Sequence, residues 1–505
     1  MAASLGFSQA QTPVRPSGSL PALGDTSELT ASAERRLGDR IARSIYRDPD
    51  YLDDPVLGDY LQGIWQPLMT AARARGELGN ELEERFAWEI MLVRDRTINA
   101  FALPGGYLGV HLGLIGVVES RDELASVLAH ELSHVTQRHI SRLLSKQSQQ
   151  MPWLIAAMVL GALAANKSPD AANAAIVGGQ ALAVQNQLSF SRDMEREADR
   201  IGFSIMADAG FDKQGFTSMF DKLQQASRLN DNGAYPYLRS HPLTTERIGE
   251  ARSRQQLESP TPSASSGEAD SARLVHALMA GRARALGDTS VDGVRSLLAD
   301  SQRVSPASAK GLSPRDAGAL YAGALAATRS RDHALARSLL ARLKPAVMGN
   351  AAAADAVELL SLEIKLAAGQ GDAAPRLAAT GSRAAVILQS RADLAAGRAQ
   401  EVSGRLQTWV STHPKDALAW QLLATALGQQ GQTLRAIRAD AESRVAELDY
   451  SAARDRFRAA QDLMRSGRDT GSGASSHIDG SIIDTRAREI DQLLREQALQ
   501  DKLDR

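Results

Sequence analysis

The clearest periodic pattern in the chain begins after Ser120, where apolar residues return at the spacing of an α-helix. Ser120 and Glu123 have the spacing of a capping box, in which the serine accepts a hydrogen bond from a first-turn amide. The apolar positions that follow at roughly helical spacing are Leu124, Val127, Leu128, Val135 and Ile140. The pattern predicts an amphipathic helix that runs from this cap to about Leu144.

Upstream of this helix, short apolar runs alternate with charged residues and turns. Met91 to Asp95 and Ala100 to Leu103 have the length of strands, and Tyr107 to His111 follows the turn at Pro104-Gly105-Gly106. These runs predict three strands of a small sheet. The segment from Glu28 to about Arg75 predicts helices instead.

The second half of the chain is rich in Ala, Leu and Arg, and its turns recur. Gly397 and Gly431 stand 34 residues apart and each closes an Ala/Leu-rich segment, while Pro414 and Trp420 open the unit between them. This spacing predicts tetratricopeptide repeats. A generic α-helical solenoid is the alternative, because the upstream units match the pattern only loosely.

Composition narrows the classes of function. The 505 residues exceed what one hydrophobic core normally supports, and 43% apolar with 4% aromatic residues favours two mainly helical domains. Lysine and arginine total 58 against 59 acidic residues, with no dense basic stripe, so nucleic acid is not expected as a partner. The chain has no cysteine, so a metal ion would have to be held by His, Asp or Glu.

Two segments leave alternatives open. Met1 to Gln11 is mildly apolar but lacks a basic start and a full apolar core, so residues 1–27 are either a disordered tail or the remnant of a signal peptide. The longest apolar run, Trp153 to Ala165, is shorter than the roughly 20 residues that span a membrane, which indicates a soluble protein. This run predicts a buried core helix; the alternative is a hairpin arm that contacts a membrane peripherally or covers the active site.

The chemistry concentrates in His130-Glu131-Leu132-Ser133-His134. On a helix the two histidines face the same side and can bind one metal ion, a pattern typical of zinc metalloproteases in which the glutamate is the general base. Zinc needs a third protein ligand and leaves a position for water, and Glu195 is the candidate. Asp199 shares a helix face with Glu195 and is expected to accept the second N–H of a ligating imidazole, whereas Glu197 points elsewhere.

This pair of motifs, HELSH followed by EREAD, resembles the gluzincin family of HtpX and the CAAX-prenyl endopeptidase. The resemblance spans much of the first half of the chain. It implies one zinc ion per chain, bound by His130, His134 and Glu195, with Glu131 as the catalytic base.

Two further segments carry the resemblance. The family's edge strand, where an extended substrate adds beside the metal, is matched by Asn99, Ala100, Phe101 and Ala102. The third motif of the family is matched by Ser240-His241-Pro242-Leu243 and the following Glu246-Arg247-Ile248, which implies that His241 and Arg247 stabilise the oxyanion near the scissile carbonyl. The resemblance also implies an alternative for His241, as a fourth zinc ligand that holds the enzyme inactive.

The whole architecture resembles periplasmic members of this family in which a soluble gluzincin precedes a tetratricopeptide array. The resemblance implies a periplasmic zinc endopeptidase that cleaves misfolded or stalled outer-membrane proteins and gives chaperone-like assistance to β-barrel assembly. Its partners would be unfolded outer-membrane proteins and, through the repeats, the outer-membrane β-barrel assembly machinery. The alternative is a chiefly non-proteolytic chaperone or adaptor that acts through the helical repeats while the metal site is capped.

The expected fold is therefore mainly α: a gluzincin metalloprotease domain with a small β-sheet, followed by an α-helical tetratricopeptide solenoid. A polar stretch rich in Ser, Pro and Gly separates the two halves. The predicted division is 1–27 (disordered tail or signal-peptide remnant), 28–257 (zinc metalloprotease domain), 258–271 (linker), 272–467 (helical repeats) and 468–505 (linker and C-terminal helix).

Overall fold

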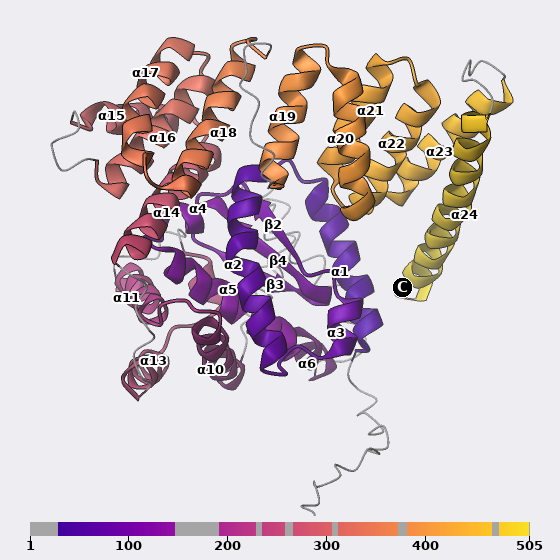
Figure 1. Ribbon diagram of the computed structural model, residues 1–505. Helices are drawn as coiled ribbons and strands as arrows, with labels where there is room; N and C mark the ends of the chain where they lie inside the picture. Colours follow the sequence, from indigo (N-terminus) through magenta and orange to yellow (C-terminus); the bar gives the residue numbers. More distant parts are fainter. Residues whose placement is uncertain are drawn as a thin grey trace, which may run out of the picture.

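The computed structural model describes residues 29–146, 191–228, 235–257, 266–305, 312–371, 381–466 and 474–503. Within these ranges the protein is mainly helical and contains one small sheet, as predicted (Figure 1). Residues 1–27 and the apolar run Trp153 to Ala165 lie outside the described residues, so the alternatives for both segments stay predictions. None of the described helices is long and apolar enough to cross a membrane.

The sheet has four strands in the order β1-β2-β4-β3. They are β1 (Tyr51–Leu52), β2 (Glu89–Val93), β3 (Ala100–Leu103) and β4 (Tyr107–His111). β4 pairs in parallel with β2 and antiparallel with β3, so β3 forms an edge of the sheet within the described residues. The predicted bounds of β3 and β4 are confirmed, and the two-residue β1 was not predicted.

The remaining predicted strand, Met91 to Asp95, is displaced by two residues toward the N-terminus. Glu89 and Ile90 already pair with β4. The chain turns directly after Val93, where the Asp95 N–H donates to the Val93 carbonyl oxygen at 2.8 Å. Hydrophobicity alone therefore misplaced this strand, because its first residues are held by pairing rather than by an apolar pattern.

A tight turn joins β3 to β4 and explains two glycines. Pro104–Gly106 forms one 3-10 turn in which Gly105 and Gly106 have φ angles of 72° and 82°, in the left-handed region that favours glycine. Helix α1 (Ala31–Tyr46) crosses this turn so closely that a Cβ on Gly38 would stand 2.0 Å from the Pro104 carbonyl oxygen. Helix α1 thereby packs on one face of the sheet.

Helix α5 (Arg121–Thr136) packs on the opposite face and carries the metal motif. Its cap is as predicted, because the Ser120 hydroxyl accepts from the Glu123 N–H at 3.1 Å. The prediction that this helix is amphipathic is wrong, since every residue from Glu123 to Thr136 is buried. Sheet, helices and loops therefore surround the motif on all sides, which holds its side chains in fixed positions.

The prediction that this helix continues to about Leu144 is wrong. Helix α5 ends at Thr136, Arg138 adopts a left-handed φ of 53°, and a separate helix α6 (His139–Lys146) follows. The break is stabilised from outside, because the Arg138 guanidinium donates to Glu34 Oε2 at 3.1 Å and to the Leu29 carbonyl oxygen. Contacts with α1 thus override the helical periodicity of the sequence.

Seven more helices lie around α5 and α6 in the described part of the N-terminal half. They are α2 (Pro55–Ala74), α3 (Asn80–Arg85), α4 (Leu112–Val117), α10 (Arg192–Asp208), α11 (Gln214–Arg228), α12 (Tyr237–Ser240) and α13 (Thr245–Leu257). Helices α10 and α11 both pack against α5.

The C-terminal half is entirely helical in its described part and arches over the N-terminal half (Figure 1). From Val291 onward consecutive helices pack against each other. The predicted turn glycines Gly397 and Gly431 follow α19 (Arg383–Ala395) and α21 (Ala417–Gln429), with left-handed φ angles of 76° and 73°. The helices are α14 (Ser266–Gly287), α15 (Val291–Arg303), α16 (Pro314–Arg329), α17 (His333–Leu343), α18 (Ala351–Ala367), α19 (Arg383–Ala395), α20 (Ala399–Thr412), α21 (Ala417–Gln429), α22 (Thr433–Ala446), α23 (Tyr450–Arg465) and α24 (Ala474–Leu503). Helix α14 begins within the segment predicted as a linker. The finer assignment to tetratricopeptide repeats stays a prediction.

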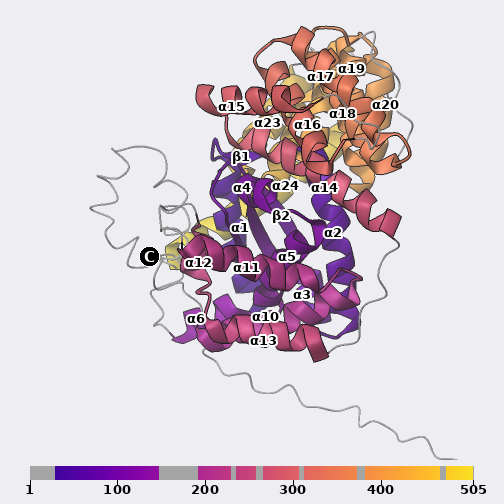
Figure 2. The same ribbon diagram turned by 90° about the vertical axis from the view of Figure 1, so that its left-hand side faces the viewer.

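Two ion-pair clusters join the halves where α14 and α19 pack on the N-terminal half (Figures 1 and 2). Arg282 of α14 donates to both carboxylate oxygens of Asp54, at 2.8 and 2.6 Å. Arg383 of α19 does the same with Asp53, at 2.7 Å each. Two adjacent aspartates before α2 therefore fix two helices of the other half.

A buried histidine on β4 makes the stability of the fold depend on pH. His111 is 3% exposed and its Nδ1 lies 2.9 Å from Thr97 Oγ1, and burial lowers its pKa to about 4 despite the nearby Asp95 carboxylate. As the pH falls below 6.5, His111 of the unfolded chain binds a proton, whereas His111 of the folded chain binds one only near pH 4. The free energy of unfolding should therefore fall by up to about 3 kcal/mol across this window.

Urea unfolding at pH 7 and pH 4.5 measures this dependence, with His111→Gln as the reference that has no group titrating at this position. The wild type should lose more stability than the variant on acidification. An equal loss in both proteins would contradict the assignment to His111.

Candidate metal centre

Three elements bring four ionisable side chains to one point. Helix α5 provides His130 and His134, α10 provides Glu195, and the segment after α12 provides His241. Helices α5 and α10 approach closely because Gly202 faces α5, where a Cβ would stand 3.1 Å from the Ala129 backbone. The glycine at position 202 therefore lets α10, which carries Glu195, pack closely against α5, which carries the two histidines.

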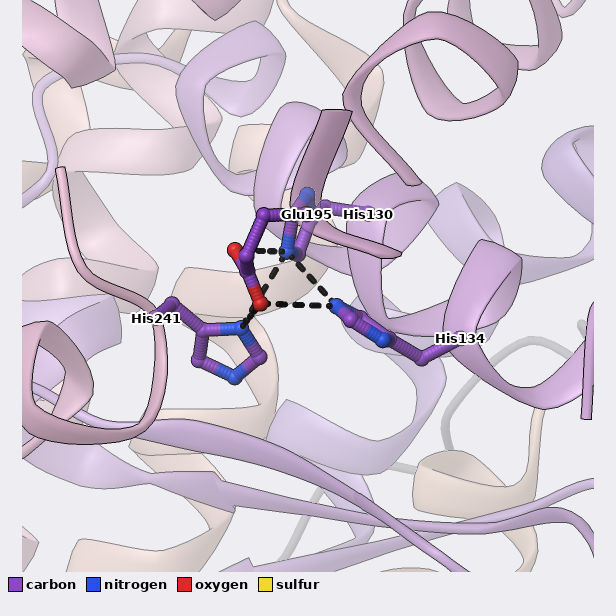
Figure 3. A group of neighbouring side chains, drawn as sticks. All are labelled: His130, His134, Glu195 and His241. Atoms are coloured by element: carbon purple, nitrogen blue, oxygen red, sulfur yellow. Dashed lines mark hydrogen bonds and ion pairs between the residues drawn. The ribbon is translucent and has the colours of Figure 1, made fainter. Parts of the chain in front are cut away.

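The geometry of the cluster is that of a metal-ligand set (Figure 3). His130 Nε2 lies 3.0 Å from His134 Nε2 and 3.5 Å from Glu195 Oε2, and His134 Nε2 lies 3.5 Å from Glu195 Oε1. Ligands at the corners of a tetrahedron around zinc, with bonds of about 2.0–2.1 Å, stand about 3.3 Å apart. All four side chains are buried.

His241 reaches the same point from the other side. Its Nδ1 lies 3.0 Å from Glu195 Oε1 and 3.3 Å from His130 Nε2. Its ring stacks on the Tyr237 ring, with ring centres 4.6 Å apart. Its backbone N–H donates to the Tyr237 carbonyl oxygen at 2.9 Å. Tyr237, which the sequence did not single out, therefore holds the imidazole in this position.

The chemistry of the donor set fits a metal ion. His130 Nε2 and His134 Nε2 lie 3.0 Å apart, and two lone pairs that faced each other at this distance would repel. A proton or a cation between the two nitrogens removes this repulsion. Burial disfavours a charged His130, but hydrogen bonds to Asp199 and Glu195 outweigh this and raise its pKa to about 9. Two imidazoles and one carboxylate are also the ligands of several catalytic zinc sites, and a metal ion here would displace the proton.

Glu131 lies beside this cluster rather than in it. Its Oε2 accepts the backbone N–H of Ala102 at 2.9 Å, and its Oε1 lies 3.4 Å from His241 Nε2 without a hydrogen-bond partner among the described residues. Complete burial raises the pKa of this carboxyl above its usual range. A carboxylate so placed can accept a proton from a water molecule at the cluster.

Asp199 and Arg247 form a second layer behind His130. Asp199 Oδ1 lies 3.0 Å from His130 Nδ1, and its role as the acceptor of the second N–H stays a prediction. Arg247 donates to both oxygens of Asp199, at 2.6 and 2.8 Å, and to the Pro242 carbonyl oxygen at 2.8 Å. Its Nη1 also lies 2.8 Å from Glu195 Oε2. In this conformation the guanidinium therefore orients the ligands, and its implied role at a scissile carbonyl stays a prediction.

The expected substrate strand meets the cluster only in part. Ala102 contacts Glu131, whereas the Phe101 ring lies over Gly109, where a Cβ would be 2.1 Å from it. Asn99 accepts the His111 N–H through its carbonyl oxygen at 3.0 Å, and Ala100 is fully buried. Of the four, Ala102 is thus the residue that the structure brings to the site; the substrate-binding roles stay predictions.

Sequence reasoning missed a second histidine contact. His139 Nδ1 lies 2.8 Å from His134 Nδ1, and His139 Nε2 lies 3.0 Å from Glu197 Oε2. Glu197 was expected to point away from the site. The sequence carried no signal for this contact, because a spacing of five residues on a continuous helix places two side chains on different faces.

Comparison with known proteins agrees with this geometry. Residues 61–255 match the model of peptidase family M48. The beta-barrel assembly-enhancing protease of Escherichia coli K12 is 31% identical over 444 residues, which cover 86% of this chain and 85% of that protein. A putative beta-barrel assembly-enhancing protease of Vibrio cholerae is 37% identical over 243 residues, 48% of each chain. The mitochondrial metalloendopeptidase OMA1 of Saccharomyces cerevisiae is 30% identical over 224 residues, 43% of this chain and 61% of that protein.

The matched residues include the whole cluster on α5, α10 and the segment after α12. The longest of these matches extends the similarity into the helical half. The chain therefore belongs to peptidase family M48 and is a metalloendopeptidase.

Proposed function

We propose that the metal is zinc, one ion per chain, held by His130, His134 and Glu195. The observation that carries this proposal is the convergence of two Nε2 atoms and one carboxylate at tetrahedral spacing, with Glu131 beside them. Zinc bound there would supply a Lewis acid that polarises the scissile carbonyl and lowers the pKa of a water molecule.

Glu131 then acts as the general base and acid. Its carboxylate takes the proton of the attacking water and delivers it to the leaving amine. The raised pKa suits the first step, because a carboxylate that holds its proton more tightly is a better base near neutral pH.

The substrate is an extended polypeptide that adds beside β3. This strand forms an edge of the described sheet, and its Ala102 N–H lies at the cluster. Backbone hydrogen bonds to an edge strand select unfolded chains, because a folded protein has few free strands to offer. Sequence preference would then come from side-chain contacts.

The substrates we propose are misfolded or stalled outer-membrane proteins in the periplasm. Support comes from the relatives in Escherichia coli and Vibrio cholerae, which are described as a beta-barrel assembly-enhancing protease and a putative one. The helices of the C-terminal half, α14 to α24, form a helical arch that offers an extended surface for such chains and for the β-barrel assembly machinery. By binding them, the arch would give chaperone-like assistance. The expected peripheral membrane contact through 153–165 is part of the same proposal.

A second function deserves a test because His241 approaches the fourth corner of the cluster. With its Nδ1 at 3.0 Å from Glu195 Oε1, it can cap the metal and exclude water. If the cap were permanent, the protein would be a chaperone or adaptor rather than a working protease. The same residue was also assigned to oxyanion stabilisation, and the two roles have opposite consequences.

Replacing His241 by alanine separates these roles. If His241 caps about nine molecules in ten, its removal should raise the rate of cleavage about tenfold. The measurement is cleavage of an unfolded outer-membrane β-barrel protein, compared with an unfolded soluble protein of equal length, together with zinc content.

Faster cleavage by the variant would support a removable cap, and a fall in kcat at unchanged KM would support the oxyanion role instead. A wild type and a variant that both bind zinc and cleave neither protein would favour the chaperone. Equal cleavage of both unfolded proteins by the wild type would contradict the proposed substrate class.

A further inference from the structure

Behind His134 lies a chain of hydrogen-bonding groups whose role the proposed mechanism leaves open. His139 is fully buried, between His134 Nδ1 at 2.8 Å and Glu197 Oε2 at 3.0 Å. Arg142, one turn further along α6, donates to the same Glu197 oxygen at 3.0 Å. The four groups come from α5, α6 and α10, so the chain joins all three elements.

The hydrogen-bonding directions in this chain follow from ligation of zinc. If His134 binds zinc through Nε2, its proton is on Nδ1, which must donate. His139 Nδ1 is then the acceptor, so the proton of His139 is on Nε2 and is donated to Glu197. Every nitrogen has one consistent role, and only the Nδ1-protonated tautomer of His134 satisfies the chain.

The arrangement parallels the contact behind the other histidine. His130 Nδ1 meets Asp199 directly at 3.0 Å, and Asp199 is anchored by Arg247. His134 Nδ1 meets His139 instead, and His139 connects it to the carboxylate of Glu197. Each ligating imidazole thus ends at a carboxylate of α10 that an arginine holds in place.

We infer that His139 and Glu197 are positioning residues that hold His134 in the tautomer and orientation required for zinc. The inference rests on the proposed zinc site. Partners of this kind raise the basicity of the ligand and reduce the rotational freedom that it loses on binding, and their removal typically weakens metal binding about 10–100-fold.

The test measures zinc affinity by competition with a chelator, using full-length protein. His139→Leu removes the acceptor at similar volume and should weaken zinc binding about 10–100-fold. His139→Asn places an amide oxygen where Nδ1 stood and should recover most of the affinity. Glu197→Leu should fall between the wild type and His139→Leu, because His139 then loses its anchor.

His276 provides the matched control. It is equally buried, at 1% exposed, and bridges Tyr60 Oη at 2.6 Å and the Val118 carbonyl oxygen at 2.8 Å, away from the cluster. His276→Leu should lower thermal stability but leave zinc affinity unchanged. If His139 were merely structural, His139→Leu would behave in the same way.

Wild-type zinc affinity in His139→Leu, or an equal loss in His276→Leu, overturns the inference. If His139→Leu does not fold, Glu197→Leu decides: unchanged zinc affinity overturns the positioning role of His139 and Glu197, and weakened affinity supports it. A wild type that binds no zinc overturns the proposed function, and this positioning role with it.

Discussion

Glu131→Gln should abolish most peptide hydrolysis, by about 10³-fold, and keep close to one zinc ion per chain. The amide oxygen still accepts the Ala102 N–H, so the side chain keeps its position, but it cannot accept a proton from water. The ligands His130 and His134 are unchanged. Cleavage of an unfolded outer-membrane protein, measured beside zinc content, separates chemistry from metal binding.

Two comparisons sharpen this experiment. Glu123→Gln changes another buried glutamate of α5, which accepts the Glu119 N–H far from the cluster, and should keep full activity. His134→Ala should lose both zinc and activity, because a ligand is gone. Cleavage by Glu131→Gln at the wild-type rate would refute the role of Glu131 as general base.

Arg282→Met should lower the free energy of unfolding by about 3–5 kcal/mol, the largest stability effect that we expect. Arg282 is 1% exposed and donates to both oxygens of Asp54 and, at 2.7 Å each, to both oxygens of Glu363. Its removal leaves the buried Asp54 and the partly buried Glu363 without this cation, which is far costlier than losing an exposed pair. Urea unfolding of the full chain measures the change.

Arg295→Met is the control, because Arg295 is 75% exposed in its pair with Asp292 and should change stability by no more than about 0.5 kcal/mol. The triple variant Arg282→Met, Asp54→Asn, Glu363→Gln should recover part of the loss, since the unpaired charges are gone. A loss below about 1 kcal/mol for Arg282→Met alone would mean that this cluster does not hold the halves together.

This ion-pair cluster also constrains the function of the helical arch. Asp54 caps α2 through the Leu57 N–H at 2.8 Å, and α2 packs directly on α5. A chain bound to the arch, as we propose, would therefore be held in a fixed relation to the metal centre rather than on a flexible tether. Such coupling would favour cleavage of the captured chain over release.

Several parts of the fold could be predicted because they depend on local patterns. The capping serine, the turn glycines and the bounds of β3 and β4 each follow from the preferences of a few neighbouring residues. The bounds of β2 could not be predicted in this way, because its pairing with β4 begins at Glu89. The burial of α5 on every side also depends on neighbours remote in the sequence.

The sequence by itself determined the reacting groups: the spacing of His130, Glu131 and His134 on one helix and of Glu195 and Asp199 on another predicts a metal-ligand set with a base and an acceptor. These relations are local, since a helix places residues four apart on one face. Tertiary structure alone decided which groups support them. Arg138 takes a left-handed conformation because α1 binds its guanidinium, and this break turns His139 toward His134 and gives Glu197 a role. Contacts between segments so far apart in the chain leave no periodic trace, because packing rather than spacing selects them.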